Sequence, residues 1–247
     1  MIMALLIGRA GSVGFPNKNV YPILGRPLMS YPLLAALHSK YIDEVFVSTD
    51  CENIKNEAKN YNVTIIDRPK ELATSTALVE QVFKHGYNYV KNELNKDIEL
   101  IVILMCNAPM ILPRTIDEGV DILRKNKNID SAVTVSEYSM FTPIRARKVE
   151  DGLLQPFMPL DKFNFRIDSN RQKAEMVYFH DCGTSVVRPE CIENYSQGLL
   201  PQKWMGHKIY PLIQQGGLDI DYEYEIPIAE GWLKKNGFTE KKLPYKA

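Results

Sequence analysis

Short runs of valine and isoleucine alternate with helix-like segments through the first half of this chain. Because these runs are apolar at consecutive positions, both of their faces are expected to be buried, as in a parallel sheet covered on two sides by helices. The expected strands are 3–8, 44–49, 63–66, 100–105 and 131–135, and the helices between them are 28–39, 52–60, 77–93 and 114–126. The pattern therefore predicts an α/β fold with three layers, a mostly parallel sheet with helices on both faces.

The second half of the chain follows a different pattern. Residues 138–175 are polar and aromatic and have no clean period, apart from a hairpin expected around Asp151 and Gly152. Such an excursion from a compact domain is usually functional or forms an interface. Strand-like runs return at 176–180, 184–188 and 207–210, and a closing helix is expected to end at Gly237. No repeat or linker is visible, so residues 1–247 are expected to form a single domain.

Charge and cysteine content exclude several classes of protein. Lysine plus arginine and aspartate plus glutamate both total 30, whereas a nucleic-acid binder usually carries a basic excess. The four cysteines form no CxxC pair, as expected for reduced thiols in the cytosol. The apolar N-terminus is too short for a membrane span and lacks the features of a signal peptide. We therefore expect a cytoplasmic protein with no nucleic-acid or membrane partner.

The first apolar run ends in a glycine-rich turn, GRAGSVGFPNKN at residues 8–19. Backbone N–H groups in such a turn can surround a phosphate, and Arg9 and Lys18 add positive charge beside it. The glycine spacing matches neither the dinucleotide-binding fingerprint nor a Walker A loop. The turn indicates either a site for a nucleoside triphosphate or similar polyanion, or a plain tight turn.

Two further segments carry candidate chemistry. In LDIDYEYEIPIAE, residues 218–230, Asp219 and Asp221 are two apart in an expected strand, so their carboxylates would point the same way. A bound Mg²⁺ would relieve their repulsion, and the alternative is a solvated acidic turn before a helix. In YFHDCGTSVVR, residues 178–188, polar groups between two expected strands would point into a cleft.

The glycine-rich turn resembles the N-terminal signature of the cytidylyltransferases that activate acidic sugars, the CMP-sialate and CMP-ulosonate synthetases. The matching positions are Arg9, Gly11, Ser12, Gly14, Pro16, Lys18 and Asn19. Three more blocks follow in the family's order, at residues 20–37, 46–50 and 68–77. The C-terminal acidic block is similar to the family's metal-binding block at Asp219, Asp221, Glu225, Ala229 and Glu230. Residues 178–188 resemble the pseudaminate-activating branch more than the sialate branch.

This resemblance implies a nucleotide-diphospho-sugar transferase type of fold with a protruding dimerisation segment at about 138–175. It implies that CTP and a 3-deoxy-ulosonic acid of the sialic acid type give a CMP-sugar and pyrophosphate, with Mg²⁺ on Asp219 and Asp221. Arg9 and Lys18 would be catalytic. Nucleotide-binding residues would be Gly8, Arg9, Ala10, Gly11, Ser12, Lys18, Asn19, Arg68, Thr74 and Thr76. Substrate-binding residues would be Asn107, Arg171, His180, Asp181 and Gly183, in a homodimer.

Several family positions are altered, which keeps other functions open. Val13 stands where the signature has a lysine, Ser75 replaces an aspartate, Met105 replaces a glutamine, and His180 replaces the arginine of the sialate branch. One alternative is a nucleotidyltransferase that uses another nucleotide, such as GTP, with a sugar 1-phosphate or phosphonate. Another is a non-catalytic protein that binds a nucleotide or sugar.

Overall fold

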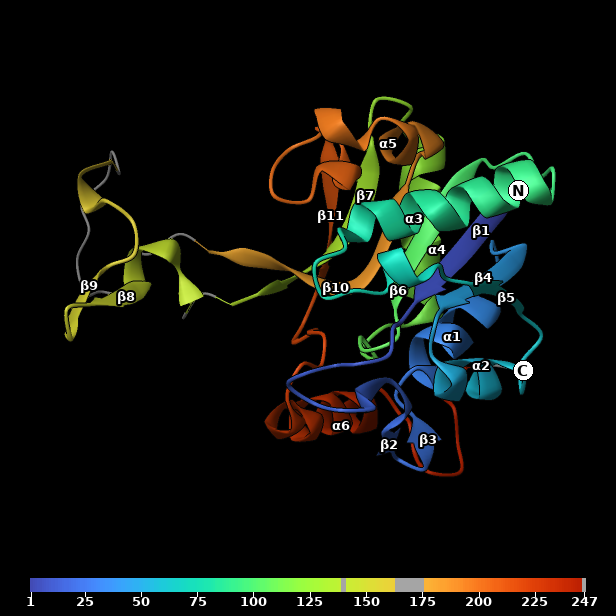
Figure 1. Ribbon diagram of the computed structural model, residues 1–247, viewed down its shortest axis with the longest axis horizontal. Helices are drawn as coiled ribbons and strands as arrows, with labels where there is room; N and C mark the ends of the chain where they lie inside the picture. Colours follow the sequence, from blue (N-terminus) through green and yellow to red (C-terminus); the bar gives the residue numbers. More distant parts are fainter. Residues whose placement is uncertain (139–140, 163–175, 246–247) are drawn as a thin grey trace.

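The computed structural model describes residues 1–138, 141–162 and 176–245. At its centre is a seven-stranded sheet in the order β11-β7-β10-β6-β1-β4-β5. The strands are β1 (Ile2–Ile7), β4 (Glu44–Thr49), β5 (Thr64–Asp67), β6 (Leu100–Met105), β7 (Ser131–Glu137), β10 (Tyr178–Val187) and β11 (Ile209–Gln214). Within this described sheet only β10 runs antiparallel to its neighbours (Figure 1). The predicted mostly parallel sheet is confirmed.

The residues of β1 alternate between two separate cores, as the pleat of a strand requires. Ile2, Ala4 and Leu6 are buried on one face of the sheet, and Met3 and Leu5 are buried on the other. Helices α1 (Ser30–Leu37), α2 (Glu52–Ala58) and α4 (Pro113–Lys125) cover the first face, and α3 (Val79–Asn88) and α5 (Pro189–Glu193) cover the second. The predicted three layers are therefore present.

A third core joins the two ends of the chain. Phe15 from the glycine-rich turn and Ile220 from the acidic segment are both buried in it, beside helix α6 (Ile226–Lys235). The small hairpin of β2 (Pro22–Ile23) and β3 (Arg26–Pro27) packs there as well. This core brings together two segments that lie about 200 residues apart in the sequence.

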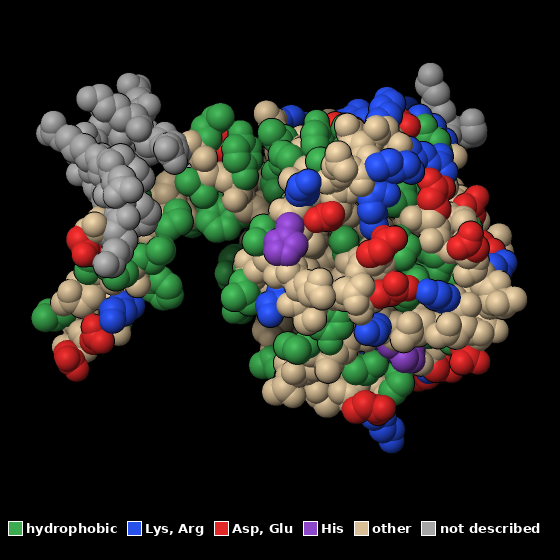
Figure 2. Space-filling model, turned by 90° about the horizontal axis from the view of Figure 1, so that it is seen from above, with side chains coloured by type: hydrophobic (Ala, Val, Ile, Leu, Met, Phe, Trp, Pro, Cys, Tyr) green, Lys and Arg blue, Asp and Glu red, His purple; other side chains and the backbone are tan. Residues whose placement is uncertain are grey.

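An arm extends away from the sheet and carries β8 (Arg147–Glu150) and β9 (Leu153–Pro156) (Figure 1). Asp151 and Gly152 connect these strands with φ angles of 52° and 77°, as in a type I′ hairpin turn, so the predicted hairpin is confirmed. All residues of the two strands are exposed. Figure 2 shows hydrophobic side chains gathered on this arm and where it meets the body.

The structure corrects three expectations about local elements. Segments 176–180 and 184–188 are not two strands but parts of β10, because a bulge with Cys182 at a φ of 59° absorbs the polar residues between them. Asp219 and Asp221 lie in a loop after β11 rather than in a strand. The helix expected from residue 77 begins at Val79, and its last turn is a π-helix, η3 (Tyr89–Glu93).

The described residues contain no helix that is long and apolar enough to cross a membrane.

Candidate functional site

A cleft of about 420 Å³ opens where β1, β5 and β6 end at their carboxyl edge. Its walls come from the glycine-rich turn, from Arg68 and the segment after it, and from Met105 and Asn107 beyond β6; Asp221 and Tyr222 close one side. The chain passes from β1 to β4 on one side, while β6 pairs with the other side of β1. Such a switch in strand order is where open α/β sheets bind their ligands.

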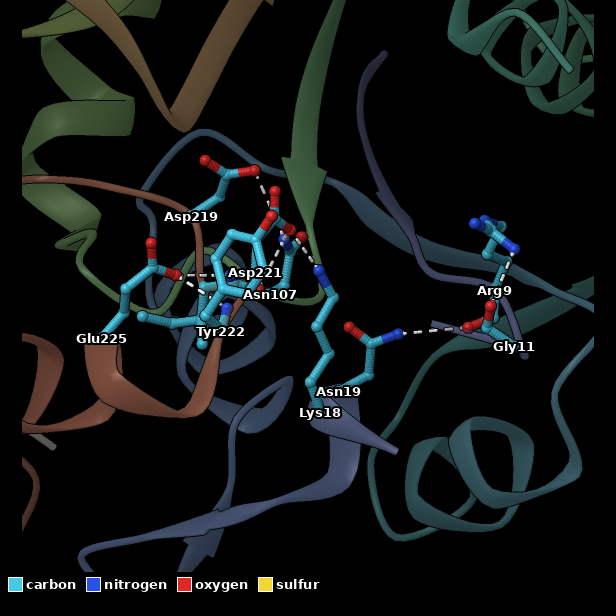
Figure 3. Close-up of polar contacts among 10 residues, drawn as sticks. Arg9, Gly11, Lys18, Asn19, Asn107, Asp219, Asp221, Tyr222 and Glu225 are labelled. Carbon is cyan, nitrogen blue, oxygen red and sulfur yellow. Dashed lines mark hydrogen bonds and ion pairs between the residues drawn. The ribbon is translucent and has the colours of Figure 1, made fainter. Parts of the chain in front are cut away.

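The glycine-rich turn is held in shape by close contacts and backbone hydrogen bonds. A Cβ at Gly8 would lie 2.6 Å from Cys106 Sγ, so only glycine fits there. Asp50 accepts a hydrogen bond from the backbone N–H of Ala10 at 3.0 Å. The Arg9 guanidinium donates to the carbonyls of Ala10 and Gly11 at 3.1 and 3.3 Å (Figure 3). The Arg9 cation therefore stays beside the turn.

Lys18 and Asn19 form the far end of the turn, in the short helix η1 (Lys18–Val20). The Lys18 ammonium forms an ion pair with the Asp221 carboxylate, and the Lys18 side chain is only 13% exposed (Figure 3). Asn19 is buried and donates to the carbonyl of Arg9 at 3.3 Å. A cation from the turn and a carboxylate from the C-terminal loop thus meet across one wall of the cleft.

Asp219 and Asp221 flank the buried Ile220, so both carboxylates lie near the Asn107 amide, which is 3.4 Å from each of them (Figure 3). Burial and the neighbouring charge of Asp221 raise the pKa of the Asp219 carboxyl. Glu225 accepts hydrogen bonds from the backbone N–H groups of Asp221 and Tyr222 at 2.7 and 2.9 Å, which fixes the loop from the side of α6.

This carboxylate pair has the chemistry of a Mg²⁺ site. Two like charges with a raised pKa at Asp219 are what a divalent cation would stabilise, and Mg²⁺ in nucleotide sites takes one or two carboxylates plus phosphates and water. Within residues 1–138, 141–162 and 176–245 no group of three or more His, Cys, Asp or Glu side chains forms a metal cage. The pair therefore has the ligand chemistry that suits a Mg²⁺ ion whose remaining ligands are water or phosphate oxygens.

The opposite end of the cleft is apolar around one buried cation. Arg68 is 7% exposed, donates to the Ser48 carbonyl at 2.6 Å, and has no carboxylate within ion-pair distance in the described part of the chain. Burial lowers the pKa of its guanidinium. Apolar side chains surround this end: Ile7, Leu72, Ala77, Val79, Val82 and Met105. Sequence reasoning missed this lining, although Leu72 and Ala77 lie within the RPKELATSTA block, and Val79 and Val82 follow it closely.

The structure brings most of the predicted nucleotide residues together in the cleft, with Asn107 as the one predicted sugar residue beside them among those that the structure describes. The predicted residues that line the cleft are Gly8, Arg9, Ser12, Lys18, Asn19, Arg68, Thr74, Asn107 and Asp221. Ala10, Gly11 and Thr76 belong to the same segments but, as far as the structure describes the chain, do not line it. Arg171 lies outside the described residues.

His180, Asp181 and Gly183 lie in the bulge of β10, away from the described lining of the cleft. The buried Asp181 carboxylate accepts hydrogen bonds from Ser136 Oγ at 2.6 Å, Gln214 Nε2 at 2.9 Å and the Gly183 N–H at 3.1 Å. A Cβ at Gly217 would lie 2.5 Å from Asp181 Oδ2. In this arrangement Asp181 supports the start of the loop that carries Asp219.

Burial lowers the pKa of His180, whose Nδ1 accepts a hydrogen bond from Gln202 at 3.1 Å. Its imidazole is therefore neutral near pH 7.

A second hollow, which we call the aromatic groove, adjoins the cleft and measures about 480 Å³. Its lining comprises Tyr138, Phe141, Phe179, Leu218, Asp219, Asp221, Tyr222, Tyr224, Glu225 and Ile228. Tyr222 and Tyr224 stack with their ring centroids 5.3 Å apart. Sequence reasoning expected residues 138–175 to be functional or to form an interface, and it missed the groove. Because Asp221 and Tyr222 line both hollows, the groove opens beside the carboxylate pair.

Several curated proteins are similar to this chain in sequence. Over 246 residues the chain is 29% identical to a Helicobacter pylori protein named pseudaminic acid cytidylyltransferase and UDP-2,4-diacetamido-2,4,6-trideoxy-beta-L-altropyranose hydrolase, covering 99% of this chain and 44% of that protein. It is 26% identical to N-acylneuraminate cytidylyltransferase of Oncorhynchus mykiss, covering 96% and 51%. The chain thus spans about half the length of the curated relatives it matches.

Solved structures share the fold. The structure of CMP:2-keto-3-deoxy-manno-octonic acid synthetase complexed with CTP superimposes with a TM-score of 0.68 at 16% identity, covering 95% of this chain and 99% of the other. The 4-diphosphocytidyl-2C-methyl-D-erythritol synthase of Anaerococcus prevotii gives a TM-score of 0.58 at 16% identity, covering 94% and 96%. Residues 3–153 match the model of the family described as cytidylyltransferase. This chain belongs to the cytidylyltransferase family.

Proposed function

We propose that this protein transfers a cytidylyl group from CTP to an acidic sugar of the 3-deoxy-ulosonic type, releasing pyrophosphate. The observation that carries the proposal is the cleft itself, where Arg9, Lys18 and Arg68 line the same hollow as Asp221 in a member of the cytidylyltransferase family. The names of the relatives support CTP and an acidic sugar as substrates. On this proposal residues 1–247 act as one nucleotidyltransferase domain.

The cleft has an end suited to each part of the nucleotide. The apolar end around Met105 and Val82 would receive the base, and Arg68 would donate hydrogen bonds to it. The triphosphate would then lie along the glycine-rich turn, where Arg9 and Lys18 offset its negative charge. In-line attack on the α-phosphorus by the anomeric hydroxyl would form the new P–O bond as the bond to pyrophosphate breaks.

Mg²⁺ would be held by Asp219 and Asp221, where it would neutralise charge on the phosphates. Lys18, which pairs with Asp221 in the structure, would turn to the phosphates once that carboxylate is engaged. Its four-carbon stem allows this movement, whereas the fork of an arginine would be harder to reorient. The Lys18 ammonium would in this way exchange the Asp221 carboxylate for a phosphate as its anionic partner.

The acceptor sugar would enter through the aromatic groove, because the groove shares Asp221 and Tyr222 with the nucleotide cleft. A sugar seated there would present its hydroxyl beside the phosphates. Four of the predicted sugar contacts lie at different places relative to the cleft. Asn107 lines it, whereas His180, Asp181 and Gly183 are not part of its described lining.

We further propose that the protein is a homodimer that uses its arm as an interface. Leu153, Leu154 and Phe157 on the arm are 65%, 72% and 64% exposed. Apolar side chains that gather in this way mark protein interfaces. Light scattering on the intact chain would measure a dimer's mass, and a monomer mass at all concentrations would contradict this part of the proposal.

The activity is tested with purified protein, Mg²⁺ and each of the four nucleoside triphosphates against a panel of sugar acids, sugar 1-phosphates and phosphonates, with pyrophosphate as readout. We expect release only with CTP and a 3-deoxy-ulosonic acid. Release of pyrophosphate only with GTP would contradict CTP as the substrate and would indicate a GTP-dependent nucleotidyltransferase. Binding of CTP without turnover on any acceptor would instead indicate a non-catalytic protein. An Asp221→Asn variant controls for contaminating activity.

A further inference from the structure

We infer that Asn107 is a positioning residue that sets the spacing of the Asp219 and Asp221 carboxylates, rather than a contact to the sugar. This inference rests on the proposed function for the role of the carboxylates. Asn107 lies two residues beyond β6, and the residues it holds lie 112 to 114 positions further along the chain. It therefore connects the end of β6 to the acidic loop.

Two hydrogen bonds tie the backbone of the acidic loop to Asn107. The Asn107 carbonyl accepts from the Ile220 N–H at 2.8 Å, and the Asn107 amide donates to the Ile220 carbonyl at 3.1 Å. The Ile220 side chain is fully buried in the third core, so this residue cannot rotate freely. The two acidic residues on either side of Ile220 are held in place by this clamp.

The Asn107 amide also lies between the two carboxylates, 3.4 Å from Asp219 Oδ2 and 3.4 Å from Asp221 Oδ1. An amide carries two N–H donors and here has three oxygen acceptors around its nitrogen, so no donor is left for a substrate. The partial positive charge of the amide lowers the repulsion between the two anions. Together with the Lys18 ammonium on Asp221, these contacts hold the two carboxylates near each other.

Removal of the amide would let the two carboxylates move apart. Asn107→Ala keeps the backbone bond to the Ile220 N–H but loses the side-chain bond to its carbonyl and both carboxylate contacts. Residues that orient metal ligands typically contribute roughly 10–100-fold to metal affinity. A residue that contacts the sugar would affect the KM for the sugar and leave the metal affinity unchanged.

The test is Mn²⁺ binding to the protein alone, measured from the free-Mn²⁺ signal in electron paramagnetic resonance. We expect Asn107→Ala to bind Mn²⁺ roughly 10–100-fold more weakly than the wild type. Asn107→Ser keeps a donor on a shorter side chain, so its Mn²⁺ affinity should lie between those of the wild type and Asn107→Ala. The matched control is Asn126→Ala, which also loses an amide-to-carbonyl bond, 2.9 Å to Ile122, but at the exposed end of α4. The control should bind Mn²⁺ like the wild type.

A second readout separates positioning from a general loss of structure. We expect the Mg²⁺ concentration for half-maximal activity to rise in Asn107→Ala, with the KM for CTP little changed at saturating Mg²⁺ and the thermal midpoint close to wild type. Unchanged Mn²⁺ affinity in both Asn107 variants would overturn the inference, as would a wild type that binds no Mn²⁺. Mn²⁺ binding that depends on Asn107 in a protein that never turns over CTP would instead overturn the proposed function alone.

Discussion

Gly14 is the point where the glycine-rich turn touches the loop that carries Asp221. A Cβ at this position would lie 2.9 Å from the Asp221 carbonyl oxygen and 3.1 and 3.3 Å from two ring carbons of Tyr222. The carbonyl belongs to backbone that Glu225 holds through the N–H groups of Asp221 and Tyr222, so it cannot retreat easily. Gly14→Ala should therefore push the two walls of the cleft apart.

The size of the effect follows from the cost of overpacking, which is about 1–3 kcal/mol for an added methyl group that its neighbours cannot accommodate. If this cost fell entirely on folding, the thermal midpoint of a chain this long would drop by about 2–12 °C. Gly14 is exposed and its turn has solvent on one side, so we expect the turn to move instead. The cost would then appear as CTP affinity lowered by a factor of about 5 to 150.

Calorimetry of CTP binding and of thermal unfolding would measure both possibilities on the same variants. The matched control is Gly231→Ala in α6, where an added Cβ meets nothing within 4 Å. Alanine in a helix is favoured over glycine by roughly 0.5–1 kcal/mol, so the control should unfold at a slightly higher temperature with unchanged CTP affinity. A Gly14→Ala variant with wild-type affinity and wild-type midpoint would refute the reasoning that the two walls are in tight contact.

Three other substitutions are expected to change activity or stability. Asp221→Ala should abolish pyrophosphate release and leave the circular dichroism spectrum unchanged, because the Asp221 side chain is 57% exposed; near-wild-type turnover would remove the metal assignment. Val13 lines the cleft and is 88% exposed, so Val13→Lys would add a cation in water-like surroundings. One phosphate charge at about 5 Å is then worth ~0.8 kcal/mol, which predicts a KM for CTP about fourfold lower at low salt. That gain should shrink at higher ionic strength, and a salt-independent effect would argue against it. Since burial lowers the pKa of His180, only the unfolded histidine takes up a proton just below pH 6.5, and the free energy of unfolding should fall as the pH drops below that value. His180→Gln should flatten this dependence in urea unfolding at pH 7.5 and 5.5, and an equally steep dependence in the variant would contradict it.

Much of the fold could be predicted from local patterns. The strands at 44–49 and 100–105 have the predicted bounds, because consecutive apolar residues between turn signals leave little choice of element. The hairpin at Asp151 and Gly152 was predictable for a similar reason, since both residues tolerate the positive φ that its turn needs. The bulge in β10 was not predictable, because its polar residues are satisfied by Ser136 and Gln214 from other strands.

The candidate site also has features that the sequence predicts and features that it does not. Residue types and spacing predict the chemistry of each part: a glycine-rich turn with two cations near one end of the chain, and two aspartates near the other. That these parts meet depends on tertiary packing, because Lys18 and Asp221 are 203 residues apart and are joined through the third core and the carboxyl edge of the sheet. The aromatic groove and the clamp at Asn107 also depend on tertiary packing. Both are formed by side chains from separate elements, and no local sequence pattern predicts that these side chains lie close together.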